Sequence, residues 1–165
     1  MRFITVNKVK KLLSGLSNSR STSADGLDNF AIKLAGPCIA KPLHHIMTLS
    51  IMQKRFPSAW KIAKVIPLQK NLKLSALDRK NYRPVALLSP LSKILEKIIY
   101  EQLYDYFTVN KILHPSLHGY RKFRSTQTAL LELYDKWVHA AHNGNISGAV
   151  LLDLSVAFDL VFMKY

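Results

Sequence analysis

The sequence predicts an α+β fold with more helix than strand, on three observations. In several segments apolar residues recur every three to four positions, which is the spacing of helices that bury one face. Shorter apolar segments at residues 61–68 and 149–154 have the length and composition of β-strands. Hydrophobic residues make up 48% of the 165 residues and charged residues 21%, so the chain can build a core and is not disordered throughout.

The first third of the chain is expected to be mostly helical. Within residues 1–20, four apolar residues have helical spacing: Val9, Leu12, Leu13 and Leu16. A polar loop with turn residues then leads to a short helix over residues 27–35, which Gly36-Pro37 is expected to end. A longer amphipathic helix over residues 39–51 follows, and Phe56-Pro57 ends it.

The middle of the chain predicts extended segments followed by a helix. Residues 61–68 interleave basic and apolar side chains as a strand and close at a proline. Residues 83–88 begin extended, because a residue before proline avoids the helical region. Ser89 and Pro90 then have the pattern of an N-cap and a first helical position.

The last third predicts a loop, a helix and a strand. Residues 113–124 are irregular and basic. Ser125 is expected to cap a helix that stops near Asn143-Gly144. Residues 149–154 have the continuous apolar pattern of a buried strand, and Asp153 lies at its end.

The charge favours a polyanionic partner. Lys and Arg number 24 against 10 Asp and Glu, a formal net charge of +14. Residues 1–80 carry 15 of these cations and 3 of the acids, whereas residues 81–165 carry 9 and 7. Nucleic acid is the first expected partner, and a solvated lysine-rich surface is the plain alternative.

Several classes of protein are not expected. No apolar stretch approaches the roughly 20 residues that cross a bilayer, and the start of the chain lacks the apolar core of a signal peptide. The single cysteine, Cys38, cannot form an internal disulfide and is expected to be a small buried hydrophobe. We therefore expect an intracellular protein, nuclear or cytoplasmic, without a membrane partner.

Asp153 is the most informative residue. A carboxylate beside apolar strand residues is costly to bury unless it is paired or binds a cation. Asp153 either caps the next segment or binds a metal ion, and Asp159 adds a second acid six residues later. Mg²⁺ often takes only one or two carboxylates, with water and substrate phosphates as its other ligands. Both interpretations remain open on these residues alone.

Four segments carry a resemblance to one family. Residues 150–159, around Asp153, are similar to the first catalytic motif (motif A) of reverse transcriptases from non-LTR, LINE-like and jockey-like, retrotransposons. Residues 56–70 and 81–97 resemble the first two fingers motifs, and residues 118–130 resemble the third segment. The four occur in the family's order, and the resemblance covers about residues 20–161.

The resemblance implies the fingers and the beginning of the palm of a right-hand polymerase, helix-rich and incomplete. The chain would be an N-terminal fragment that ends just after motif A. Residues 1–20 would be a truncated lead-in and residues 21–147 the fingers region. Residues 148–165 would hold the start of the palm and a divergent C-terminus.

The resemblance also implies catalytic and nucleotide-binding residues. Asp153 would be the catalytic carboxylate and a ligand of Mg²⁺, with the main-chain carbonyl of Leu154 as a further ligand. Phe158 would be the gate that excludes a ribose 2′-OH. Arg83 and Lys70 would bind the phosphates of the incoming nucleotide, and a planar guanidinium suits that task.

A nucleic-acid path is implied as well. Its residues would be Arg121, Lys122, Arg124 and Ser125. Tyr120 and Phe123 place aromatic rings among these cations, and single strands are held by charge and by base stacking. Phe123 stands where the family commonly has glycine.

The parent reaction implied by the resemblance is DNA synthesis from an RNA template, a DNA primer and dNTPs. The family's Tyr-x-Asp-Asp motif does not occur in the 165 residues, nor does a thumb. We therefore expect the chain to be inactive on its own. Two alternatives remain open: a non-catalytic basic module that binds nucleic acid, and a decayed retroelement remnant without function.

Overall fold

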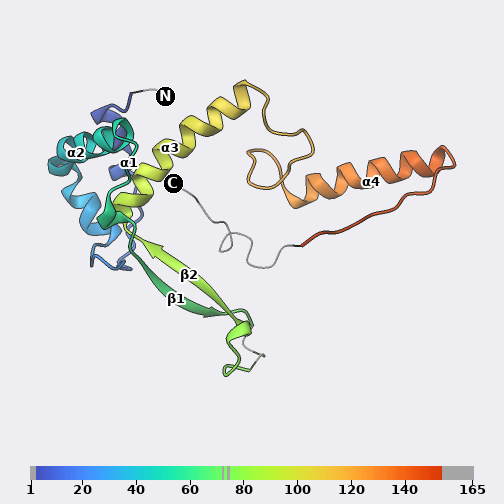
Figure 1. The fold of residues 1–165 in the computed structure, drawn as a ribbon, viewed down its shortest axis with the longest axis horizontal. Coiled ribbons are helices and arrows are strands. Elements are labelled where there is room, and N and C mark those ends of the chain that lie inside the picture. The colour runs from blue at the N-terminus through green and yellow to red at the C-terminus, as the bar shows by residue number, and fades with distance from the viewer. Residues whose placement is uncertain (1–2, 72, 74, 154–165) are drawn as a thin grey trace. The chain divides into compact units, whose positions relative to one another are not determined.

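The computed structural model describes residues 3–71, 73 and 75–153. They form two compact units, the first running to Ile112 and the second beginning at Leu113. The first unit contains α1 (Val6–Ser14), α2 (Asn29–Met52), β1 (Ala63–Gln69), β2 (Tyr82–Leu88) and α3 (Pro90–Val109), with short 3₁₀ turns η1 (Ser58–Trp60) and η2 (Arg79–Asn81). The second contains α4 (Thr126–His142) (Figure 1). The mixture of helices with one small sheet confirms the α+β class.

The core of the first unit lies among its three helices. α1 packs mainly on α2, and both also contact α3. The buried apolar residues of this core are Val9, Leu13, Ile32, Ala40, Leu43, Met47, Trp60, Ile94, Leu95 and Ile98. An ion pair between Lys8 and Glu101, 2.5 Å from Nζ to Oε2, joins α1 to α3 at the surface. The predicted helical spacing of the lead-in is thus confirmed, since Val9 and Leu13 face the core.

The expected break at Gly36-Pro37 is wrong, because α2 continues through it. Pro37 removes the N–H of one helical hydrogen bond and its ring crowds a carbonyl of the preceding turn, at a cost of about 3 kcal/mol. Apolar residues on both sides of it, including Ile32 and Ala40, are buried in the same core, and their packing offsets this cost. Gly36 does not end the helix: a Cβ there would lie 3.3 Å from Leu13 Cβ, so glycine allows α1 to approach α2 closely.

The exposure of Cys38 corrects a second expectation about this helix. The thiol is exposed rather than buried. Gly36, Ala40, Leu43 and Met47 form the inward stripe of α2 at intervals of three and four residues, and position 38 falls outside that stripe. Residue type alone therefore misplaced this side chain, although helical spacing would have placed it.

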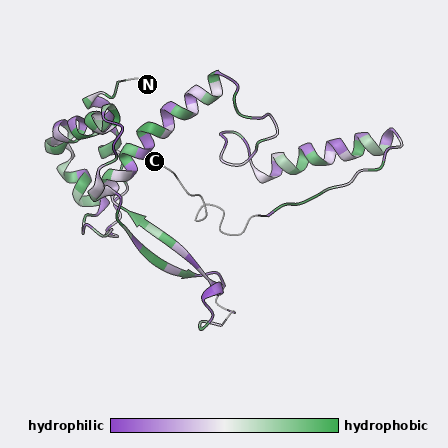
Figure 2. Cartoon of the chain, in the orientation of Figure 1, coloured by the Kyte–Doolittle hydropathy of each residue, from purple (hydrophilic) through white to green (hydrophobic). Residues whose placement is uncertain are grey.

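The two strands form an antiparallel hairpin. Ala63 pairs with Leu88 at one end and Gln69 with Tyr82 at the other, which confirms strands in both predicted segments. Asp78 caps η2 in the connection, and its carboxylate accepts from Lys80 N–H at 2.9 Å. Hydrophobic residues line both strands (Figure 2), but Val65 and Leu68 are more than half exposed.

The strand β2 leads directly into a well-capped helix. Ser89 accepts a hydrogen bond from Leu91 N–H at 3.3 Å and Pro90 is the first residue of α3, as predicted. Ser23 and Asp25 hydrogen-bond each other in the polar loop that precedes α2. Burial alone would raise the pKa of Asp25, but hydrogen bonds from Ser23, Ser89 and its own loop outweigh burial and hold that pKa below its usual value.

The second unit is a long loop followed by α4. Ser125 and Thr128 form a capping box: Ser125 Oγ accepts from Thr128 N–H at 3.3 Å, and Thr128 Oγ1 accepts from Ser125 N–H at 2.9 Å. The helix ends at His142 with Asn143 as its C-cap, and Gly144 follows with a left-handed φ of +70°. Both predicted ends of this helix are confirmed.

The predicted strand over residues 149–154 is wrong for the residues that are described. Residues 149–153 are not a strand, and Val150, Leu151 and Leu152 are each about 90% exposed. A strand is stable only where a neighbour pairs with its backbone groups. In the described part of the second unit no strand lies beside this segment.

Among the described residues, no helix has both the length and the apolar character needed to cross a bilayer.

Candidate nucleotide-binding and nucleic-acid-binding sites

The far end of the β1–β2 hairpin brings together the two predicted nucleotide-binding residues. Arg83 pairs with Leu68, one position before the last pair of the register, and Lys70 is the first residue after β1. The register therefore places Arg83 at the end of the hairpin beside which Lys70 lies, which the sequence alone did not establish.

The two cations differ in their surroundings. Lys70 N–H donates to Asn81 O at 2.7 Å, and its Nζ donates to Lys80 O at 2.8 Å, so this side chain follows the connection between the strands. Arg83 is exposed, and no hydrogen bond or ion pair joins its guanidinium to the described residues. An exposed guanidinium can bind two phosphate oxygens through its planar fork.

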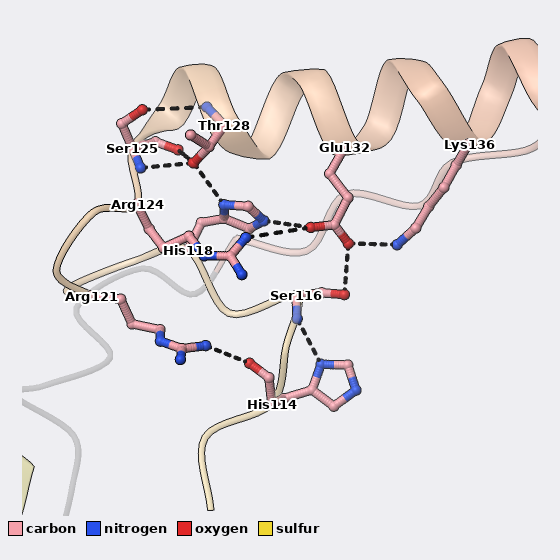
Figure 3. A network of polar contacts seen from close by, with 9 residues as sticks. All are labelled: His114, Ser116, His118, Arg121, Arg124, Ser125, Thr128, Glu132 and Lys136. Carbon is pink, nitrogen blue, oxygen red and sulfur yellow. Dashed lines mark hydrogen bonds and ion pairs between the residues drawn. The ribbon is translucent and has the colours of Figure 1, made fainter. Parts of the chain in front are cut away.

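The predicted nucleic-acid-binding residues lie in the basic loop, which we define as residues 113–124, and at the start of α4. Arg121 donates through Nη1 to His114 O at 3.0 Å, and Arg124 Nη1 lies 3.9 Å from Glu132 Oε2 (Figure 3). Lys122 is exposed. The hydroxyl of Ser125 caps α4. The structure thus gives Ser125 a role in folding, and a contact of Ser125 with nucleic acid remains a prediction.

Two exposed aromatic residues flank these cations. Tyr120 and Phe123 are 93% and 100% exposed, so both rings are open to solvent. Both have left-handed backbone conformations, with φ of 56° and 61°. Residues with a Cβ rarely adopt this conformation and glycine adopts it readily. This geometry explains why glycine would suit position 123 better than phenylalanine.

Glu132 of α4 organises the basic loop, and the sequence analysis did not identify it. Its carboxylate accepts from Lys136 Nζ at 2.7 Å and from Ser116 Oγ at 2.8 Å, and it lies 2.8 Å from His118 Nε2 (Figure 3). These hydrogen bonds lower the pKa of Glu132 from 4.5 to about 2, and the bond from Lys136 has the largest effect. The spacing of Glu132 and Lys136, four residues apart on one helix, predicts their ion pair from the sequence. The contacts of Glu132 with the basic loop cannot be predicted in this way.

Asp153, the predicted catalytic residue, is exposed. It belongs to the second unit and Arg83 to the first. The predicted roles of the Leu154 carbonyl and of Phe158 fall on residues outside those that the structure describes. In the described ranges, no group of three or more His, Cys, Asp or Glu side chains could hold a metal ion. A single exposed carboxylate is not a complete Mg²⁺ site, so no chemical step is assigned to a metal here.

The first unit also contains a cleft that is separate from the predicted residues. It has a volume of about 610 Å³ and lies between the start of α1 and the second half of α3. Lys8 and Glu101 are among the residues that line it. None of the residues predicted for nucleotide or nucleic-acid binding lines this cleft.

The sequence over residues 68–165 matches the family described as reverse transcriptase (RNA-dependent DNA polymerase), and the chain belongs to that family. Individual relatives indicate the type of mobile element. It is 30% identical over 159 residues to an RNA-directed DNA polymerase from the mobile element jockey of Drosophila melanogaster, a match that covers 96% of this chain and 17% of the relative. The identity is 28% over 165 residues to a probable RNA-directed DNA polymerase from transposon BS of the same species, with the same coverage.

A third relative belongs to another element. The identity is 27% over 110 residues to a retrovirus-related Pol polyprotein from the type-1 retrotransposable element R1 of Bradysia coprophila, covering 67% of this chain and 11% of the relative. The chain is thus part of a reverse transcriptase of the non-LTR retrotransposon class, and it spans about 17% of the length of the first two relatives. No solved structure matches the chain.

Proposed function

We propose that this chain supplies the nucleotide-phosphate site and part of the template path of a non-LTR retrotransposon reverse transcriptase. The observation that carries the proposal is the hairpin register, which brings Arg83 to the end of the hairpin where Lys70 follows β1. The exposed Arg83 guanidinium binds phosphate oxygens of the incoming dNTP as a fork, and Lys70 adds a point charge beside it.

The reaction that the proposal serves is DNA synthesis on an RNA template. The 3′-OH of a DNA primer attacks the α-phosphate of the dNTP and pyrophosphate leaves. Reverse transcriptases are nucleotidyl-transfer enzymes that typically use a divalent metal, and Mg²⁺ is the proposed ion. Asp153 and the Leu154 carbonyl are its proposed ligands, and Phe158 is the proposed gate against ribonucleotides.

The 165-residue chain is proposed to need further residues for catalysis. Asp153 is one exposed carboxylate, and the Tyr-x-Asp-Asp sequence is absent from these residues. The stated reaction needs carboxylates that hold metal ions against both the attacking and the leaving oxygens. We therefore expect no primer extension by this chain alone, and Asp153-dependent incorporation in such an assay would contradict this expectation.

Template binding is proposed for Arg121, Lys122 and Arg124, with Ser125 at the end of the path. Tyr120 and Phe123 expose rings on which RNA bases can stack. The same observations favour a second candidate function, a non-catalytic module that binds RNA or DNA. A decayed remnant without function would bind neither nucleotide nor nucleic acid specifically.

Nucleotide binding tests the hairpin site. We would titrate dTTP into the chain and compare Arg83→Ala with a matched control, Lys64→Ala. Lys64 pairs with Leu87 on the same face of the hairpin as Arg83, so both variants remove one cation from that face. The control lies four residues from Leu68, or about 13 Å along the strand.

The two variants are expected to differ clearly. Loss of a charge-assisted contact worth about 1.5–3 kcal/mol weakens binding by about 10-fold or more in Arg83→Ala. Lys64→Ala should remain within about twofold of the natural chain, because an exposed charge at that distance is screened by salt. Equal losses in both variants, or no binding of dTTP by the natural chain, would contradict the nucleotide site.

A further inference from the structure

The basic loop has few apolar contacts to fix its shape. It connects α3 to α4 and contains two residues, Tyr120 and Phe123, in left-handed conformations that favour glycine. No residue of α4 is buried, so an apolar core does not clamp the loop to this helix. Ordering each residue of such a loop costs conformational entropy. Directional polar contacts must therefore supply much of the restraint.

Glu132 supplies three of these contacts from one carboxylate. Ser116 Oγ donates to Oε1 at 2.8 Å, and His118 Nε2 lies 2.8 Å from Oε2. Arg124 Nη1 lies 3.9 Å from the same Oε2. These three residues span the loop from near its start to its last position, so one side chain of α4 holds both of its ends (Figure 3).

His118 connects this carboxylate to the helix cap. Its other ring nitrogen, Nδ1, lies 2.9 Å from Thr128 Oγ1, and Thr128 forms the capping box with Ser125. The side chain of His118 is only 11% exposed. The path from Glu132 through His118 to the cap therefore fixes both sides of the segment that carries Arg121 and Arg124.

We propose that Glu132 is a positioning residue for nucleic-acid binding: its carboxylate holds the basic loop in the shape that receives a single strand. The inference rests on the proposed function of Arg121, Lys122 and Arg124. Glu132 itself carries the wrong charge to contact phosphate. Its effect runs through Ser116, His118 and Arg124, which it aligns before the strand arrives, so less ordering remains to be done on binding.

The proposal predicts the direction in which nucleic-acid affinity changes when Glu132 is neutralised. Removing an acid from a basic surface should strengthen binding of a polyanion, if charge alone matters. Removing a positioning acid should weaken it in spite of the gained charge. Asp135 offers the matched control, because it is an exposed acid on the same helix and no hydrogen bond or ion pair joins it to the described residues. Glu132→Gln and Asp135→Asn change the net charge equally.

The experiment measures binding of the full chain to a labelled single-stranded RNA of about 15 nucleotides across a salt series. Glu132→Gln is expected to weaken binding on the order of 3- to 10-fold and to flatten the salt dependence, because fewer phosphates are engaged. Asp135→Asn should leave binding unchanged or raise it by up to about twofold. The helical circular dichroism signal of both variants should match the natural chain.

A second variant keeps the test independent of helix stability. Ser116→Ala removes one arm of the contact from the loop side and leaves the charge unchanged, so it should also weaken binding, and the Glu132→Gln/Ser116→Ala double variant should lose less than the sum. The inference is wrong if Glu132→Gln binds as tightly as Asp135→Asn, or if Ser116→Ala has no effect. Absence of RNA binding by the natural chain would instead overturn the proposed function.

Discussion

The two units of this chain are stabilised by different interactions. The first unit buries ten apolar residues among α1, α2 and α3. The second unit, as far as Asp153, contributes no residue to this core, and its loop and helix are joined by polar contacts around Glu132. Burial is non-directional and tolerates many sequences, whereas a polar network depends on each donor and acceptor. Mutations should therefore act by volume in the first unit and by hydrogen-bonding chemistry in the second.

The largest expected effect is the loss of a core side chain in the first unit. Leu95 is fully buried on α3, and Leu95→Ala should lower the free energy of unfolding of the first unit by about 2–5 kcal/mol. Leu131→Ala is the control, since Leu131 of α4 is 66% exposed and should cost less than about 0.5 kcal/mol. Urea unfolding followed by helical circular dichroism measures the difference, because Trp60 and Trp137 lie in different units and tryptophan fluorescence would mix their signals. Similar costs for both variants would contradict the contrast between the units.

A somewhat smaller effect is expected where the helices approach most closely. Gly36→Val places a branched side chain against Leu13, where even a Cβ lies at 3.3 Å. The added volume must push α1 from α2, at a cost of about 1–3 kcal/mol. The same unfolding measurement applies, with Leu34→Val as the control at a 74% exposed position of α2. An unchanged stability for Gly36→Val would show that α1 does not pack closely at this point.

A smaller gain is expected in the second unit at the left-handed Phe123. Phe123→Gly relieves about 1 kcal/mol of backbone strain in the folded loop. Glycine also raises the conformational entropy of the unfolded chain, which destabilises the folded loop by about 0.5 kcal/mol, so a small net stabilisation remains. Amide hydrogen exchange in the basic loop should therefore slow slightly. Phe123→Ala removes the same ring and keeps the strain, so it should not slow exchange. Both variants should bind RNA less tightly if bases stack on this ring.

The smallest and most local effect is a pH dependence of the basic loop. The lowered pKa of Glu132 means that its ionised form is favoured by the folded loop. This stabilisation is present above the ordinary carboxyl pKa of 4.5 and is lost as the pH falls through about 2. NMR signals of Ser116 and His118 should shift in that window, and Glu132→Gln should abolish the part of the shift that Glu132 causes.

Local patterns predicted most of the elements because local chemistry sets them. The caps at Ser89 and Ser125 and the stop at Gly144 follow from side chains that act within a few residues. The break expected at Gly36-Pro37 failed because tertiary packing of α2 overrode a local signal. The strand at residues 149–153 failed for the converse reason, since a strand needs a partner that its own sequence does not contain.

The candidate sites were predictable in part. The family resemblance implied roles for Arg83, Lys70 and Arg121 as separate residues, and the hairpin register was needed to place Arg83 at the end of the hairpin beside which Lys70 lies. Glu132 escaped notice because its partners Ser116 and His118 are 16 and 14 residues away in sequence. Long-range polar contacts leave no periodic signal, so a structure was required to find them.

RNA binding across a salt series tests the central claim most directly, namely that the second unit presents the nucleic-acid-binding cations. We would compare the full natural chain with an Arg121→Ala/Arg124→Ala variant and with Lys93→Ala/Lys97→Ala, which removes two exposed cations from α3. The loop variant should reduce the slope of log affinity against log salt by about 1.4, and the α3 variant should leave it unchanged. Equal slopes for all three chains, or equal reductions in both variants, would contradict the account.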